Sequence, residues 1–217
     1  LPLYFQRGYH TRQLSLSAGW NYSNGMVANM REIEWGQGGL ISNIQHIGFS
    51  RGLHKLSFGV GFSDQVRMSH RDIAPRWGYT LSTNYTFNPA NSHFSDLISF
   101  YGQAYLPGFV RHNSVKVAAT YQTSLGGYKS PSGYSPLSYR STRLIPRGFT
   151  SADILSNNYT AMSLDYQLPV WCPEGGIGSV VYIKRIRLNA GGDYAQFRDA
   201  GHDVWRRIWS VGGDLVV

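Results

Sequence analysis

The sequence has one cysteine, few charged residues and no long hydrophobic run, and each shortage excludes a class of protein. A single thiol, Cys172, cannot form an internal disulfide or a cysteine-based metal site. No segment approaches the roughly 20 apolar residues of a membrane-spanning helix, and the mean hydropathy is −0.28. Charged residues make up only 15% of the chain, against about 25% in an ordinary globular domain. The chain is therefore not a helical membrane protein, and its composition is unusual for a soluble domain.

Aromatic residues and glycine are abundant instead. Aromatics make up 14% of the 217 residues, and there are 15 tyrosines and 25 glycines. This mixture, with few charges and low mean hydropathy, is typical of a membrane β-barrel, in which only alternate residues are apolar. The net charge is +8, but lysine and arginine gather only at 184–187 and 206–207. We therefore expect contacts with anionic lipid head groups and with a polar lumen, and no nucleic-acid partner.

Several segments place an apolar residue at every second position. The clearest contains Leu14, Leu16, Ala18, Trp20 and Tyr22, with small or polar residues between them. Successive side chains of a β-strand point to opposite faces, so this segment has one apolar and one polar face. In a soluble sandwich the apolar face packs inward, whereas in an outer-membrane barrel it contacts lipid and the polar face lines the lumen. The alternation alone leaves both geometries open.

The pattern predicts nine strands, with residues 1–6 as the possible end of an earlier one. They cover residues 11–23, 40–50, 54–63, 78–88, 97–106, 114–123, 159–168, 180–197 and 207–217. Most run to about 9–13 residues, which suits a tilted crossing of a bilayer better than the 5–6 residues common in soluble sheets. The sequence therefore predicts an all-β, antiparallel transmembrane β-barrel. We expect residues 1–217 to form part of one such domain, and an incomplete one, because the sequence is strand-like at both of its ends.

The segments between the strands differ in length. Residues 107–113 form a short turn, whereas residues 124–158 are a long insert rich in serine, tyrosine, glycine and proline. Outer-membrane barrels have short periplasmic turns and long external loops. We therefore expect the long insert to lie on the external side.

Within this insert lies the sequence Leu-Ile-Pro-Arg-Gly-Phe, which contains Arg147. Asp165 and Asp193 follow on the next two predicted strands, and both fall in the inward-facing phase. The planar guanidinium of an arginine suits paired carboxylate acceptors. An arginine carried into the lumen on the loop could therefore bridge both acids and hold the loop inside the barrel, although the tripeptide alone is also compatible with a tight turn.

The ordered set of Arg-Gly-Phe, Ser-Leu-Asp-Tyr-Gln-Leu-Pro at 163–169 and Leu-Asn-Ala-Gly-Gly-Asp-Tyr at 188–194 resembles a known family. It is similar to the C-terminal barrel of the bacterial surface antigen superfamily, the BamA- and TamA-like assembly barrels. The Pro-Arg-Trp-Gly sequence at 75–78 looks like the strand opening of this family. The resemblance covers about residues 70–217. One departure is Pro146, where the family usually has valine or isoleucine.

The resemblance implies a sixteen-stranded barrel, of which this chain would hold about nine to ten strands. It implies that residues 124–158 form an external loop folded into the lumen. The residues that hold the loop there would be Arg147, Gly148, Phe149, Asp165 and Asp193. The implied function is to assemble, insert or translocate other polypeptides at the bacterial outer membrane. Its partners would be the lipid bilayer and lipopolysaccharide, unfolded outer-membrane or secreted client proteins, and accessory lipoproteins.

Three other functions remain open on the sequence. A passive porin-like channel shares all the strand features and lacks only the loop and its acids. An outer-membrane hydrolase would need an oriented serine, histidine and acid, and no such set is evident. A soluble β-sandwich would bury the apolar faces. We therefore expect no enzymatic activity, no cofactor and no metal.

Overall fold

The structure is a computed structural model. It describes residues 1–23, 27–36, 39–48, 53–68, 72, 74–90, 94–110, 112–127, 144–150, 153, 154, 156, 158–172, 175–177, 181–183, 185–198 and 204–216. Much of the predicted insert at 124–158, including residues 128–143, lies outside these described residues. The described residues of the insert are 124–127, at the end of β8, and those from Leu144 onward.

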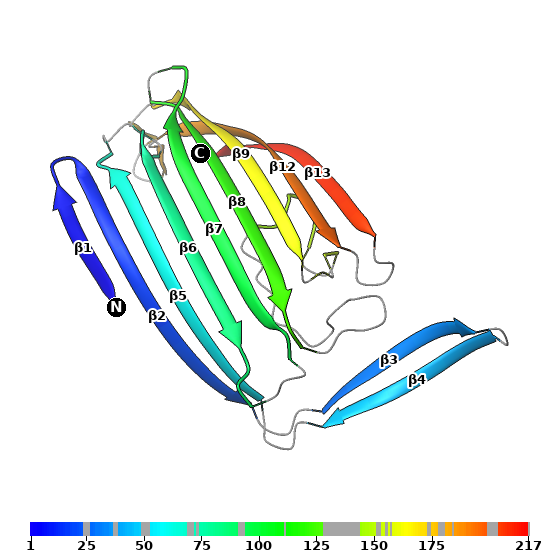
Figure 1. The fold of residues 1–217 in the computed structure, drawn as a ribbon. Helices are drawn as coiled ribbons and strands as arrows, with labels where there is room; N and C mark the ends of the chain where they lie inside the picture. The colour runs from blue at the N-terminus through cyan, green and yellow to red at the C-terminus, as the bar shows by residue number, and fades with distance from the viewer. Residues whose placement is uncertain are drawn as a thin grey trace.

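One antiparallel sheet of nine strands forms most of the described structure (Figure 1), in the order β1-β2-β5-β6-β7-β8-β9-β12-β13. The strands are β1 (Pro2–Arg7), β2 (His10–Ser23), β5 (Leu53–Val66), β6 (Gly78–Phe87), β7 (Asp96–Pro107), β8 (Ser114–Leu125), β9 (Tyr159–Trp171), β12 (Ile186–Arg198) and β13 (Trp205–Val216). The prediction of an all-β, antiparallel fold is confirmed. The sheet is curved but not closed, because β1 and β13 are its edges.

Two hairpins lie outside this sheet and correct the predicted strands. β3 (Val27–Gly36) pairs with β4 (Gly39–Gly48) in a separate two-stranded sheet. The alternation at 40–50 was therefore a real strand, but β3 was missed and neither strand joins the main sheet. The single strand expected at 180–197 is wrong. The structure divides it into β11 (Val181–Ile183), which pairs with β10 (Gly175–Ile177), and β12, which begins at Ile186.

The two ends of the sheet differ in the length of their connections. The turn end holds the connections β1–β2, β5–β6, β7–β8 and β9–β12. The loop end holds β2–β5, which includes the β3–β4 hairpin, β6–β7, β8–β9 and β12–β13. Both of the longest connections, 24–52 and 126–158, are at the loop end. The short turn at 107–113 and the long insert at 124–158 therefore lie at opposite ends of the sheet, as the sequence predicted, although the turn-end connections 67–77 and 172–185 are longer than 88–95 and 199–204 at the loop end.

The two faces of the sheet are fixed by the strand register, because residues directly opposite each other share a face. One face carries the segment that begins at Leu144 and is called the loop face. A typical row on it is Lys116–Asp165–Gly191–Gly212. The opposite face is called the outer face, and a typical row on it is Val117–Leu164–Gly192–Val211.

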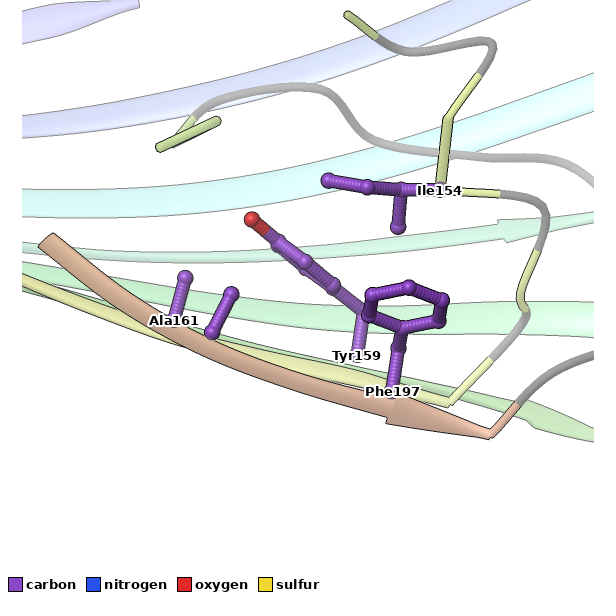
Figure 2. Packing of buried hydrophobic residues seen from close by; sticks show 5 residues of the cluster. Ile154, Tyr159, Ala161 and Phe197 are labelled. Carbon is purple, nitrogen blue, oxygen red and sulfur yellow. The ribbon is translucent and has the colours of Figure 1, made fainter. Parts of the chain in front are cut away.

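The buried apolar core lies on the loop face. It contains Ile154 of the loop, Tyr159 and Ala161 of β9, and Ala195 and Phe197 of β12. Figure 2 shows Ile154 of the loop over the side chains of Tyr159 and Phe197. The outer face has the opposite character, because its large apolar side chains are exposed. Examples are Met162 at 52% exposure and Leu164 at 54%.

Candidate functional site

A tight turn at Pro146–Phe149 presents Arg147 to the sheet. The backbone N–H of Phe149 donates to the carbonyl oxygen of Pro146 at 3.2 Å, which closes a four-residue turn. Gly148, the third residue of this turn, has a φ of +80°. A positive φ at this position is characteristic of a type II turn and strongly favours glycine. The glycine of the Arg-Gly-Phe sequence is therefore needed for backbone geometry, since open space surrounds the position of its absent Cβ.

Arg147 contacts both acids. Its guanidinium forms an ion pair with Asp165 through Nη2 and Oδ1. Its Nε lies 3.7 Å from Oδ2 of Asp193, and its backbone N–H donates to the same oxygen at 3.0 Å. The carboxylate of Asp193 is nearly buried and also accepts a hydrogen bond from the hydroxyl of Ser210 at 3.2 Å. The loop is thus attached to β9 and β12 through charge-assisted hydrogen bonds, which are stronger than neutral ones, and Ser210 of β13 bonds to the Asp193 carboxylate that takes part in this attachment.

Two glycines make room for the arginine. Gly191 and Gly212 lie directly opposite each other on β12 and β13, in the same row as Asp165. A Cβ added at Gly191 would lie 2.6 Å from Nη1 of Arg147 and 2.6 Å from the carbonyl oxygen of Leu164. A Cβ at Gly212 would lie 3.4 Å from Cδ of Arg147. The position that Arg147 occupies, called its seat, is therefore bordered by the carboxylates of Asp165 and Asp193. It has room for the guanidinium because Gly191 and Gly212 carry no side chains.

Beside the ion pairs, apolar packing also holds the loop against the sheet. Leu144 and Ile145 of the loop pack against the buried core. The phenol of Tyr159 donates to the carbonyl oxygen of Leu144 at 2.5 Å. Burying apolar side chains of both the loop and the sheet stabilises the docked arrangement by about 25 cal/mol per Å² of apolar surface removed from water. The loop is consequently held by apolar packing as well as by charge.

The segment after Phe149 is held in a turn by hydrogen bonds between its own residues. The carboxylate of Asp153 accepts hydrogen bonds from the backbone N–H of Thr150 at 2.7 Å and from its hydroxyl at 2.8 Å. These bonds hold the pKa of the exposed Asp153 carboxyl below its ordinary value, because they stabilise the ionised form. The chain is thereby directed back toward Ile154 and the apolar core.

The structure brings together all five residues that the sequence singled out. Arg147, Asp165 and Asp193 are in direct contact, Gly148 forms the turn, and Phe149 supplies the closing N–H of the turn and is half-buried. The departure at Pro146 does not disturb this arrangement. Pro146 is fully buried and its carbonyl oxygen accepts the turn's hydrogen bond. Gly191 and Gly212 were missed as parts of the seat, although Gly191 lay in the quoted 188–194 sequence.

Two polar clusters at the turn end were also missed. Asp64 accepts hydrogen bonds from His10 and Arg12. Asp72 in the β5–β6 connection pairs with His112 at 2.7 Å, and its carbonyl oxygen accepts from Arg185 at 3.2 Å. These contacts join residues 40 or more positions apart, so only the strand register could have revealed them.

Family models, curated proteins and solved structures were each compared with the chain, and none of the three comparisons finds a match. No helix in the described part of the chain has the length and apolarity needed to cross a bilayer. The described residues also contain no group of three or more histidine, cysteine, aspartate or glutamate side chains placed to hold a metal ion.

Proposed function

We propose that this chain is part of an outer-membrane β-barrel that assembles, inserts or translocates other polypeptides. The observation that carries the proposal is the attachment of Arg147 to Asp165 and Asp193. This contact matches the loop arrangement that the resemblance to the bacterial surface antigen superfamily implies. A passive porin-like channel needs no such attachment.

The outer face supports a location in a membrane. Its exposed large apolar residues extend across the whole sheet, from Leu16 on β2 to Val211 on β13. Exposed apolar patches of this extent are rare on soluble monomers. On β9 the outer apolar residues run from Met162 to Val170. Eight steps of about 3.3 Å, tilted by about 40°, cover about 20 Å of bilayer thickness, close to the apolar band of about 25 Å of membrane barrels.

The polar loop face supports a lumen. The residues of β2 and β5 on this face are serine, glycine and other small or polar residues, which a soluble sandwich would not bury as its core. Serines and glycines face each other there in register, as Ser15 opposite Gly61, Ser17 opposite Gly59 and Ser57 opposite Gly19. A face of this kind suits contact with water inside a barrel. The apolar core that does exist on this face is supplied by the loop.

The loop supports an assembly function. In a large barrel, a loop fixed across the wall would narrow the lumen and hold the wall strands β9, β12 and β13 in a defined arrangement. No covalent chemistry is needed for such a role. Arg147, Asp165 and Asp193 are therefore positioning residues in this proposal.

The test is Arg147→Ala in the full-length protein. We expect a barrel that still folds, a loop that becomes accessible to protease, and a loss of about tenfold or more in the insertion or secretion of client proteins. The matched control is Lys116→Ala, because Lys116 is a cation in the same row of the loop face and takes no part in the ion pairs of Arg147. Full client assembly by an Arg147→Ala protein with a released loop would overturn the proposal. A large, steady conductance of the wild-type protein would favour the porin-like channel instead.

A further inference from the structure

The outer face changes character abruptly at the turn end of β1, β2, β5 and β6. One row contains only apolar residues, Leu3–Leu14–Phe62–Leu81. The next row toward the turn end is Phe5–Arg12–Asp64–Tyr79, and the row beyond it is Arg7–His10–Val66. Cationic side chains therefore begin within one step of the apolar face and on the same side of the sheet.

A buried carboxylate organises two of these side chains. The side chain of Asp64 is only 8% exposed, and its two oxygens accept from Nδ1 of His10 and Nε of Arg12, each at 2.8 Å. The side chains of His10 and Arg12 are themselves 47% and 41% exposed. Because Asp64 accepts only from Nε of Arg12, both terminal nitrogens of its guanidinium remain as donors, and Nε2 of His10 is not used by Asp64. Asp64 therefore holds the two side chains in fixed positions.

The surroundings add charge and aromatic surface. Arg7 is exposed. Phe5 and Tyr79 flank the pair in the same row and are also exposed. Aromatic residues beside arginine at the end of an apolar face are characteristic of the boundary between hydrocarbon and head groups.

We infer that Arg7, His10 and Arg12, ordered by Asp64, form a binding site for the phosphate of an anionic phospholipid at the turn end. The inference rests on the proposed membrane location of the outer face. Charge complementarity favours an anionic head group, because arginine presents paired N–H donors that match phosphate oxygens. Continuity with the apolar row Leu3–Leu14–Phe62–Leu81 favours a lipid over a soluble anion, since the acyl chains of a bound lipid would cover that row.

The experiment uses the full-length protein in phosphatidylcholine vesicles that contain a small amount of spin-labelled phosphatidylglycerol or spin-labelled phosphatidylcholine. The motionally restricted fraction of each label reports its association with the protein surface. For the wild type we expect phosphatidylglycerol to associate about threefold or more over phosphatidylcholine, a preference that one or two basic residues at a membrane surface can supply. High salt should reduce this preference, although less than for a diffuse surface charge.

Two variants and a control locate the effect. Arg7→Gln removes one charge, and the double variant Arg12→Gln/Asp64→Asn removes the ordered pair without changing the net charge. Each of these variants should lower the preference for phosphatidylglycerol. The triple variant Arg7→Gln/Arg12→Gln/Asp64→Asn should bring the ratio of phosphatidylglycerol to phosphatidylcholine association near one. The control Lys116→Gln/Arg187→Gln removes two charges from the loop face and should leave the preference unchanged.

The possible results test the lipid site and the membrane location of the outer face separately. Equal restriction of both lipids by the wild type, or an unchanged preference in the variants, would overturn the site and leave the membrane location standing. An equal loss in the control would assign the preference to overall charge and would also overturn the site. If neither label is restricted by the wild type, the outer face does not contact lipid, and both the site and the membrane location are wrong.

Discussion

The loop face has two regions with the same strand geometry and different side chains. Over β9 and β12 it carries Tyr159, Ala161, Asp165, Asp193 and Phe197, and the loop covers these residues. Over β2 and β5 it carries mainly serine and glycine, with no buried apolar cluster among the described residues. Both regions alternate polar and apolar residues along their strands. Alternation therefore places a residue on a face, but the size and charge of the residues decide whether a segment can dock there.

The serine–glycine region shows how a face without a docked loop is filled. The hydroxyl of Ser17 donates to the carbonyl oxygen of Gly59 at 3.4 Å, and that of Ser15 donates to Gly61 at 3.3 Å. A Cβ at Gly59 would lie 2.5 Å from Oγ of Ser17, so each serine lies over the glycine opposite it. This region satisfies its own hydrogen bonds across the strand pair and offers neither a large apolar side chain nor a carboxylate to a loop.

The largest expected effect comes from the apolar cluster under the loop. Phe197→Ala removes a nearly buried ring under the loop and should destabilise the folded protein by about 3 kcal/mol, within the usual range for large-to-small core changes. The comparison is Leu164→Ala on the outer face, where the side chain is already exposed and the loss should be under about 1 kcal/mol. Urea unfolding in detergent micelles measures both. Equal losses would show that the loop does not form a core.

The two glycine environments give the next largest difference. Gly191→Ala places a Cβ against the backbone carbonyl of Leu164, which cannot move aside, and should cost about 2 kcal/mol as an overpacked position. Gly59→Ala meets first the hydroxyl of Ser17, which can rotate, and should cost about 0.5 kcal/mol or less. The same unfolding measurement compares them. A larger cost at Gly59 than at Gly191 would contradict the proposed seat for Arg147.

A smaller loss of docking stability is expected when only one of the two carboxylates that contact Arg147 is neutralised. Asp165→Asn keeps the shape of the side chain but removes the charge that faces Arg147, whose side chain is 40% exposed. After discounting for this exposure, about 1 kcal/mol of docking energy should be lost. Cleavage within the loop by a protease should then accelerate about fivefold, while Asn84→Asp on the open region should leave the rate unchanged. An unaltered rate in Asp165→Asn would mean that packing alone holds the loop.

The smallest effect concerns pH. The pKa of Asp153 is lowered in the folded protein by its hydrogen bonds to Thr150. Its contribution is therefore complete above the pKa that it has in the unfolded chain, and is lost as the pH falls through the lower folded value. Because the carboxyl is fully exposed, we expect only a slight rise in loop cleavage at acidic pH, measured with an acid-active protease. Asp153→Asn should remove this rise.

Part of this arrangement could be predicted from the sequence because it depends on local period. Alternation located eight of the nine main strands and assigned Asp165 and Asp193 to the same face, with Arg147 in the loop before them. The rest depends on register between distant strands. Asp64 meets Arg12 only because β2 pairs with β5 across an intervening hairpin. β3 was missed because its apolar residues alternate poorly, and the break between β11 and β12 was hidden by apolar residues on both sides of 184–185.

Lipid contact along β9 tests the assignment of the two faces of the sheet directly. A fluorophore is attached in turn to single cysteines at positions 162, 163, 164, 166 and 167 of the full-length protein, in a Cys172→Ser background that keeps Asp165, and is quenched with spin-labelled lipid in vesicles. We predict strong quenching at 162, 164 and 166 and weak quenching at 163 and 167, which lie on the loop face. Uniform quenching, or stronger quenching at 163 and 167, would contradict the membrane location of the outer face.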